Sequence, residues 1–372
     1  MIVELPTEHD GVVEFRVHST TADTTSLVWA KGENLVAPTT GDMGLTASLL
    51  PNMHRGEPLS VEGTVDSGLL ESTEEIQAIF STWDRTRHVE APWYHRTPVE
   101  VQGVRPQTIN SSGPGQVATF FTGGVDSFYT LLKHLDHIDA VVYVHGFDLS
   151  LQDLPRRREV TERLGLITKS LGVELLELES NLQAYGDEHG IGWPDYHGAA
   201  LAAIAHLLNN RFGTVLIPAT HTYSHMQGLG SHPLLDRLWS NSTLKIVHDG
   251  ADATRMDKLR FLADHPIARE HLRVCWANLD PQRTYNCGRC EKCIRTGVAV
   301  RVAGLDGQFP TIISPSLKEV IQVPDIGRGI YWSMMRDELV ASGANKKLRA
   351  ALDLVIARRQ LKVWKWTSRI TP

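Results

Sequence analysis

The sequence predicts an α/β fold: an open parallel sheet with helices on both faces. Between residues 115 and 304, apolar stretches such as AVVYVHGF and TVLIPATH alternate with stretches whose apolar residues have helical spacing. Strands buried on both faces are apolar throughout, so this alternation is typical of a parallel sheet covered by helices. A length of 372 residues leaves room for more than one domain.

The segments on either side have a different pattern. In residues 1–110, GVVEFRVH and SLVWAKGE alternate apolar and polar residues as half-buried strands do, and GLLESTEEIQAIFSTW has helical spacing. A stretch rich in Pro, Gly and Ser follows within 103–115 and marks a boundary. We therefore expect a smaller α+β domain at 1–110, the α/β domain at 115–304 and a helical segment at 305–372.

The composition and net charge of the chain argue against some classes of function. Apolar residues make up 42% and charged residues 22% of the chain, and the net charge is -6. This mildly acidic balance does not favour a nucleic-acid partner. No stretch approaches the ~18 consecutive apolar residues of a membrane span, and the N-terminus does not resemble a signal peptide. We expect a cytoplasmic protein, in which four cysteines are more suited to a metal than to disulfides.

The stretch TFFTGGVDS at residues 119–127 has the features of an anion site. Its glycines let backbone N–H groups approach a ligand closely, and the following helix offers unpaired N-terminal donors. Thr122 and Ser127 add hydroxyl groups. Asp126 beside a phosphate implies a bridging cation such as Mg²⁺. The alternative is a tight corner in which Asp126 only caps the helix.

The four cysteines lie close together in the sequence. Cys287, Cys290 and Cys293 form a C-x2-C-x2-C pattern, and Cys275 precedes them in LRVCWANLDPQRTYNCGRCEKC. This spacing predicts a closed, structural Zn²⁺ site with four thiolate ligands. An iron–sulfur cluster uses similar spacings and is the competing interpretation.

FFTGGVDSFYTLL resembles the SGGxDS signature of the PP-loop ATP pyrophosphatases, with Thr122 in place of the usual Ser. The resemblance implies that the loop holds the pyrophosphate end of ATP while the substrate becomes adenylated. It assigns catalysis to Asp126 and Ser127. The positions that the resemblance places at the phosphates and near adenine are Thr122, Gly123, Gly124, Asp126, Ser127, His145, Gly146 and Phe147.

Together with the cysteine pattern, residues 117–303 resemble the 7-cyano-7-deazaguanine synthases, which form a nitrile in queuosine precursor biosynthesis. The chain departs from that family where WPDYHGAAL replaces Pro-Gly-Arg-Asn, and where it adds an N-terminal domain and a basic C-terminal segment. We therefore expect an acceptor other than free carboxy-deazaguanine. Three predicted substrate residues, His221, His225 and His232, follow a strand on the ligand side of the sheet. Tyr196 and His197 start a helix on the same side, and Arg237 corresponds loosely to a position in the synthases. Any of these histidines could instead be structural.

The expected activity is that of a ligase that forms carbon–nitrogen bonds and cleaves ATP to AMP and pyrophosphate. A carboxylate or amide is adenylated, and a nitrogen nucleophile then gives an amide, a nitrile or a conjugate. The expected cofactors are ATP, Mg²⁺ and Zn²⁺. The expected partners are a small-molecule or protein acceptor and an ammonia or amine donor, without membrane or nucleic acid; a homodimer is left open. The alternatives are a tRNA-modifying PP-loop enzyme and a non-catalytic nucleotide-binding module.

Overall fold

The computed structural model describes residues 1–88, 90–106, 115–277, 279–280, 282, 285–323 and 329–367, with side chains up to residue 360. It divides into two compact units, which we describe separately. The first consists of Met1–Phe121, Thr130–Asp153 and Leu171–Ala251, and the second of Thr122–Tyr129, Leu154–Ser170 and Asp252–Pro372.

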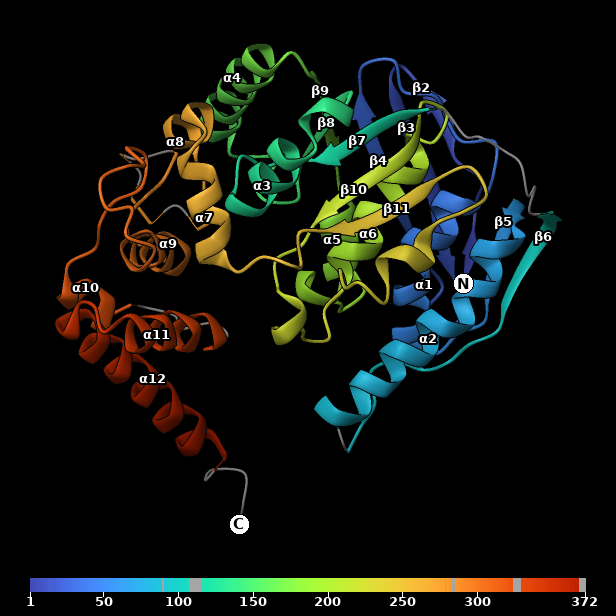
Figure 1. The fold of residues 1–372 in the computed structure, drawn as a ribbon. Helices are drawn as coiled ribbons and strands as arrows, with labels where there is room; N and C mark the ends of the chain where they lie inside the picture. Colours follow the sequence, from blue (N-terminus) through green and yellow to red (C-terminus); the bar gives the residue numbers. More distant parts are fainter. Residues whose placement is uncertain are drawn as a thin grey trace. The chain divides into compact units, whose positions relative to one another are not determined.

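The first unit contains a sheet of eleven strands (Figure 1). The strands are β1 (Ile2–Val3), β2 (Thr7–His9), β3 (Val12–Ser19), β4 (Thr24–Gly32), β5 (Leu59–Asp66), β6 (Val99–Arg105), β7 (Gln116–Phe120), β8 (Ala140–His145), β9 (Glu174–Ser180), β10 (Phe212–Pro218) and β11 (Lys245–Asp249). Their order is β11-β10-β7-β8-β9-β4-β3-β1-β5-β6, and β2 pairs with β3 beside this path.

Helices account for most of the remaining described residues. The first unit has α1 (Asp42–Arg55), α2 (Ser67–Arg87), α5 (Leu182–Glu188), α6 (Trp193–Leu207) and the 3-10 turns η1 (Leu135–His137), η2 (Tyr223–His225) and η3 (Asp236–Trp239). The second has α4 (Leu154–Leu171), α7 (Arg255–Ala263), α8 (Pro266–His271), α9 (Glu291–Val302), α10 (Leu317–Ile321), α11 (Ile330–Ser342) and α12 (Lys346–Thr367). The helix α3 (Val125–Lys133) runs from the second unit into the first.

Five neighbouring strands, β11-β10-β7-β8-β9, are parallel throughout, with pairs such as Val215 with Ala118 and Val141 with Leu175. The strand that comes first in the chain, β7, lies in the middle, and the later strands add on both of its sides. Such a point is where ligands bind in open α/β sheets, outside the carboxyl ends of the strands. The TGGVDS stretch directly follows β7. The prediction of an open α/β sheet is confirmed, and the more specific PP-loop fold stays a prediction.

The strands of residues 1–105 continue the same sheet. β4 pairs antiparallel with β9, matching Ala30 with Ser180 and Lys31 with Glu179, and β3, β1, β5 and β6 follow. The sheet as a whole is therefore mixed but mostly parallel. The segment expected as a separate domain thus shares its sheet with residues 115–251. Independent folding of residues 1–110 stays a prediction.

The core of the first unit is packed around α1 and α6. α1 is buried along almost its whole length, and alanines at 199, 200, 202 and 203 let α6 approach its neighbours closely. Tyr196 is fully buried, and its hydroxyl donates to the Ala47 carbonyl oxygen at 2.7 Å. Gly198 lies against Gly230, because a Cβ atom added to Gly198 would lie 1.9 Å from the Gly230 carbonyl oxygen.

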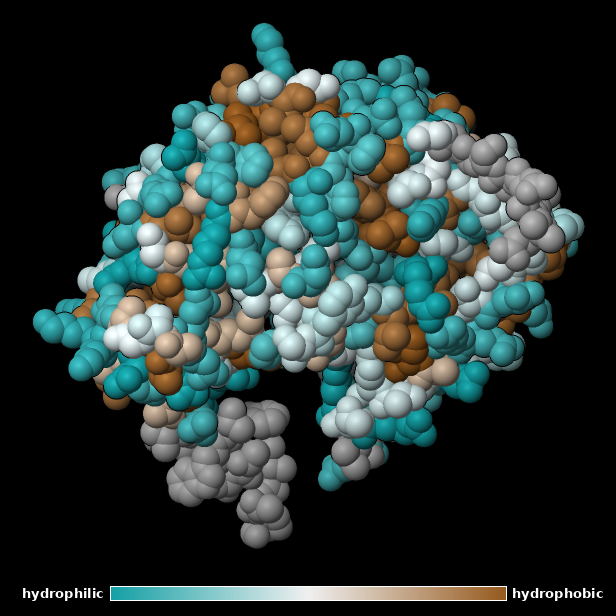
Figure 2. Space-filling view, viewed as in Figure 1, coloured by the Kyte–Doolittle hydropathy of each residue, from teal (hydrophilic) through white to brown (hydrophobic). Residues whose placement is uncertain are grey.

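The second unit is helical around the cysteine segment. α9 contacts α7, α10 and α11, and α12 packs against α10 and α11 (Figure 1). None of the described helices is long and apolar enough to cross a membrane. On the face in view, hydrophilic and hydrophobic residues are intermixed (Figure 2).

The close contact at Gly198 gives a test of the fold. Gly198→Ala should reduce the free energy of unfolding by about 3 kcal/mol, since backbone must move to admit the methyl group. Gly165→Ala, in α4, is the matched control because a Cβ there meets nothing within 4 Å. It should stabilise by about 0.5–1 kcal/mol through helix propensity. Denaturant unfolding measures both, and equal effects of the two substitutions would contradict the packing described.

Candidate functional site

The turn Thr122–Ser127 forms the start of α3. Gly123 has φ +71°, a conformation that side-chain-bearing residues rarely adopt. The Ser127 hydroxyl oxygen accepts hydrogen bonds from the amides of Thr122 (3.2 Å) and Gly124 (3.0 Å). The first N–H groups of a helix have no partner within it, so the start of α3 presents donors to an anion. The residues predicted at the phosphates therefore form one continuous turn.

Two cations hold the Asp126 carboxylate. Its Oδ2 accepts from Arg255 Nη2 at 3.1 Å, and its Oδ1 accepts from Lys258 Nζ at 3.0 Å. Burial opposes ionisation of Asp126, but the positive charges of Arg255 and Lys258 outweigh it and lower the pKa of the carboxyl group. Lys292 acts in the same direction. Asp126 therefore stays ionised, and the surroundings of the turn carry net positive charge.

This pairing bears on the expected Mg²⁺ ion. Each oxygen of Asp126 already accepts a hydrogen bond from a side-chain cation, which leaves one lone pair on each oxygen for a further partner. Mg²⁺ is commonly held by water and substrate phosphates, with few protein ligands. In this structure Asp126 holds Arg255 and Lys258 beside the turn, and the role expected for it at a bridging cation stays a prediction. Magnesium stays a prediction, and ATP does too.

A backbone hydrogen bond joins the turn to the cysteine segment. The Arg273 amide donates to the Gly123 carbonyl oxygen at 2.8 Å, and the Arg273 guanidinium donates to the Cys275 carbonyl oxygen at 3.2 Å. The Asn286 side chain accepts from the amides of Val274 (2.8 Å) and Cys275 (3.1 Å). The residues beside the turn are thus fixed from within the cysteine segment.

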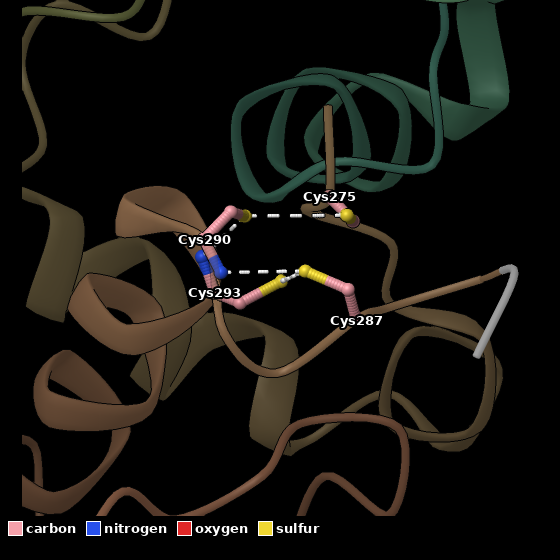
Figure 3. A group of neighbouring side chains, drawn as sticks. All are labelled: Cys275, Cys287, Cys290 and Cys293. Atoms are coloured by element: carbon pink, nitrogen blue, oxygen red, sulfur yellow. Dashed lines mark hydrogen bonds between the residues drawn. The ribbon is translucent and has the colours of Figure 1, made fainter. Parts of the chain in front are cut away.

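The four cysteines are buried and their sulfur atoms point toward one another (Figure 3). All four sulfurs lie within 4.8 Å of one another, with Cys275 to Cys290 and Cys287 to Cys293 at 4.0 Å. A tetrahedral ion with metal–sulfur bonds of ~2.3 Å places its sulfurs roughly 3.8 Å apart. The cluster can therefore bind one metal ion, and its dimensions are compatible with Zn²⁺.

Backbone N–H groups around the cysteines also favour binding of one metal ion. The amides of Arg289 and Cys290 donate to the Cys287 sulfur at 3.5 and 3.3 Å, and α9 begins directly after Cys290. N–H donors and the positive end of a helix both stabilise thiolates. An iron–sulfur cluster holds its thiolates apart by its own inorganic core. Sulfurs as close as these favour a single ion.

The residues predicted near adenine lie in the first unit. His145 ends β8, and its Nε2 contacts the Glu177 carboxylate. Gly146 has φ +96°, and a Cβ there would lie 2.1 Å from the Ser180 carbonyl oxygen, so only glycine fits. The Phe147 ring lies 4.9 Å from that of Trp193. Their contact with adenine stays a prediction.

The predicted substrate residues are dispersed over the first unit. Tyr196 is a core residue whose hydroxyl is already bonded, which favours a structural role. Arg237 is 62% exposed and pairs with Glu75 at 3.2 Å. His225 Nδ1 contacts the Ser224 hydroxyl at 2.8 Å in η2, and His221 is buried in the loop after β10. The structure does not bring these four together.

His197 and His232, by contrast, share a neighbour. The Asp236 charge acts on both rings, and Asp236 Oδ2 accepts from His248 Nδ1 at 2.7 Å. Sequence reasoning missed Asp236 and His248, as it missed the role of Lys258 beside Asp126. Two signals pointed to this group: His248 stands next to the last residue of an apolar strand, and Asp236 follows His232 by four positions.

Comparison with known proteins does not identify a family: no family model matches the chain, and neither a curated protein nor a solved structure matches it. The PP-loop resemblance therefore rests on the TGGVDS turn and the cysteine pattern alone.

The cysteine cluster should bind one zinc ion per chain. Structural zinc contributes about 10–16 kcal/mol of binding free energy, as much as the whole stability of many domains. Cys290→Ser, or chelation of the wild-type protein, should release the ion. Either change should speed amide exchange at Arg273, because its segment loses its anchor. Metal analysis by mass spectrometry and hydrogen exchange measure these effects. Iron together with acid-labile sulfide would contradict the prediction.

Proposed function

We propose that the chain is an ATP-dependent ligase that adenylates a carboxylate or an amide and passes it to a nitrogen nucleophile, with release of AMP and pyrophosphate. The observation that carries the proposal is the turn at the start of α3, where N-terminal helix donors lie beside the cations paired with Asp126. Such a turn, directly after the central strand of a parallel sheet, suits the polyphosphate of a nucleotide.

Each residue of the turn has a defined task in this proposal. The amides at the start of α3 and the hydroxyl of Thr122 donate to phosphate oxygens. Arg255 and Lys258 stabilise the negative charge that grows on pyrophosphate as the acceptor oxygen attacks the α-phosphorus. Asp126 keeps both cations in place before the reaction, so that little reorganisation is needed. Mg²⁺, if bound through the phosphates, would add a further positive charge.

The cysteines favour this chemistry over sulfur transfer. The chain has four cysteines, and all four lie in the buried cluster. A thiolase would need a further thiol to carry sulfur, and none remains. A glutaminase would likewise need a free nucleophilic cysteine. The nitrogen is therefore supplied as ammonia, as an amine or by a partner protein.

A pyrophosphate-release assay tests the proposal. The purified protein is incubated with ATP, Mg²⁺, ammonia and a panel of carboxylates and amides, and AMP and pyrophosphate are quantified together. Equal amounts of the two products, dependent on the acceptor, support the ligase. ATP binding without cleavage across the panel would favour the nucleotide-binding module, and copurifying RNA would favour the tRNA-modifying alternative.

Asp126→Asn should lower pyrophosphate release about 100-fold, because Arg255 and Lys258 lose the charge that orients them. It should also destabilise the protein by about 3–5 kcal/mol, since Lys258 is 2% exposed and would lose the carboxylate that compensates its buried charge.

Lys258→Met separates the two effects of that substitution. It removes one of the two cations on Asp126, which keeps Arg255 as a partner, so activity should fall while stability falls less than in Asp126→Asn. Asp306→Asn removes an exposed carboxylate near Arg301 and serves as control, with an effect below about 1 kcal/mol. Full activity in Lys258→Met would remove the turn from the proposed mechanism.

Carboxy-deazaguanine should not be converted to the nitrile at a rate above background. Where the synthases have Pro-Gly-Arg-Asn, this chain has Pro194-Asp195-Tyr196-His197, and Asp195 pairs with Arg87 at 3.0 Å. A two-pronged arginine contact with the acceptor carboxylate is therefore missing at this position. Mass spectrometry of the reaction detects the nitrile, and rapid conversion would show that another residue binds the carboxylate.

A further inference from the structure

A pocket of about 350 Å³ lies between α2 and the segment 92–96 that follows it, within the first unit. The polar residues that line this α2 pocket are Ser81, Thr82, Arg85, Tyr94, His95 and Arg96. Arg85 follows Ser81 and Thr82 by four and three positions, so all three lie on one side of the helix. Sites for small molecules have volumes of roughly 300–1,000 Å³, so the pocket is large enough for a small ligand.

Buried side chains of α2 hold the opposite wall of the α2 pocket in place. Asp84 Oδ2 accepts from the amides of Trp93 (2.6 Å) and Tyr94 (3.1 Å), and Gln77 Oε1 accepts from the Thr97 amide (2.7 Å). Asp84 and Gln77 are both buried. The backbone on the two sides is therefore joined before a ligand binds, and binding does not have to pay for ordering it.

The α2 pocket carries positive charge without a compensating acid. Arg85 and Arg96 are exposed, and the described residues that line the pocket include no carboxylate. Within the described part of the chain, neither guanidinium pairs with an aspartate or a glutamate. The exposed Arg16 of the same unit does, because it lies 3.7 Å from Glu4. Two uncompensated cations beside one pocket attract an anion.

The polar groups of the α2 pocket are mainly hydrogen-bond donors. Arg85 Nη2 donates to the Thr82 hydroxyl oxygen at 3.2 Å, so the hydroxyl proton of Thr82 can be donated to a ligand. The guanidinium groups of Arg85 and Arg96 each present a planar fork of N–H groups, which suits the oxygens of a phosphate or a carboxylate. The ring of His95 has an N–H in either tautomer. The pocket therefore suits a ligand with several acceptor oxygens.

We propose that the α2 pocket binds the phosphate group of a small phosphate monoester. Such a phosphate has a charge of about −1.5 to −2 at pH 7 and three strong acceptor oxygens, which match two guanidinium groups and a hydroxyl. A carboxylate has one charge and two oxygens, so it would leave one guanidinium uncompensated. The pocket belongs to the first unit and the turn Thr122–Ser127 to the second. The inference therefore goes beyond the proposed function and does not rest on it.

Backbone amide NMR tests binding without requiring activity. The full chain, labelled with ¹⁵N, is titrated near pH 7 with glycerol 3-phosphate and with inorganic phosphate, and the amides of Thr82 and His95 report on the α2 pocket. Sodium acetate and sodium chloride at equal ionic strength are the controls. We expect saturable shifts with glycerol 3-phosphate. Shifts with inorganic phosphate alone, equal shifts with acetate or chloride, or no shift would each overturn the proposal.

Substitutions assign the binding to the two arginines. Arg85→Gln and Arg96→Gln should each raise the Kd of glycerol 3-phosphate about tenfold or more, the loss of a hydrogen bond between charged groups. Arg85→Lys keeps the charge but loses the fork, so its Kd should rise less. Arg16→Gln, in β3, is the matched control and should leave the Kd unchanged. An unchanged Kd in Arg85→Gln or in Arg96→Gln would overturn the proposal, provided that denaturant unfolding shows the variants to be folded.

Lys258→Met separates the α2 pocket from the proposed nucleotide site. It alters the cations beside Asp126 and should leave the Kd of glycerol 3-phosphate unchanged. A weaker Kd in this variant would place the binding at the turn Thr122–Ser127 and overturn the proposal. Saturable shifts without ATP cleavage would leave the α2 pocket standing while the ligase fails, and ATP cleavage without shifts would do the reverse.

Discussion

The convergence of four cysteine sulfurs fixes a segment that apolar burial could not hold. The stretch from His271 to Cys293 is rich in polar and charged residues, and within its described part the Asn286 side chain accepts from the backbone amides of Val274 and Cys275. One of these bonds, from the Arg273 amide to the Gly123 carbonyl oxygen, reaches the turn at the start of α3. A metal ion at the cysteines would therefore order the turn at the start of α3 as well as its own ligands.

The turn also depends on a balance of charge. An isolated carboxylate at the start of α3 would repel a phosphate, but Asp126 is bonded to two cations, so the group as a whole is positive. The lysine-bearing Walker pattern, which supplies its cation from within the loop, is absent from the sequence. Here the cations come from α7, about 130 residues later in the chain. The glycines of the turn allow its backbone to approach a ligand closely, and the positive charge comes from Arg255 and Lys258 in α7.

The sequence was informative where the determinants are local. A strand, a glycine turn and a helix follow one another in TFFTGGVDSFYTLL, and the cysteine spacing itself specifies convergence, so both features could be predicted. Pairings between residues that are far apart in the sequence could not be predicted. Nothing in the local pattern of β4 shows that it pairs with β9, and nothing near Asp126 indicates Lys258. Tyr196 shows the converse, because its place at the start of a helix suggested a substrate contact, whereas its buried hydroxyl donates to the Ala47 carbonyl oxygen.

The histidines show how far a hydrogen-bond pattern can define chemistry that composition cannot. Seventeen histidines occur in the chain, and their number alone says nothing about function. In His248, His197 and His232, however, each Nδ1 atom has a partner of fixed character, a carboxylate, a carbonyl oxygen or an amide, and in the neutral ring that partner determines the role of the opposite nitrogen. Neutral rings can present both donors and acceptors, whereas protonated rings present donors only. Burial lowers the pKa of His197 and of His232, so near pH 7 each of these two rings presents one donor nitrogen and one acceptor nitrogen.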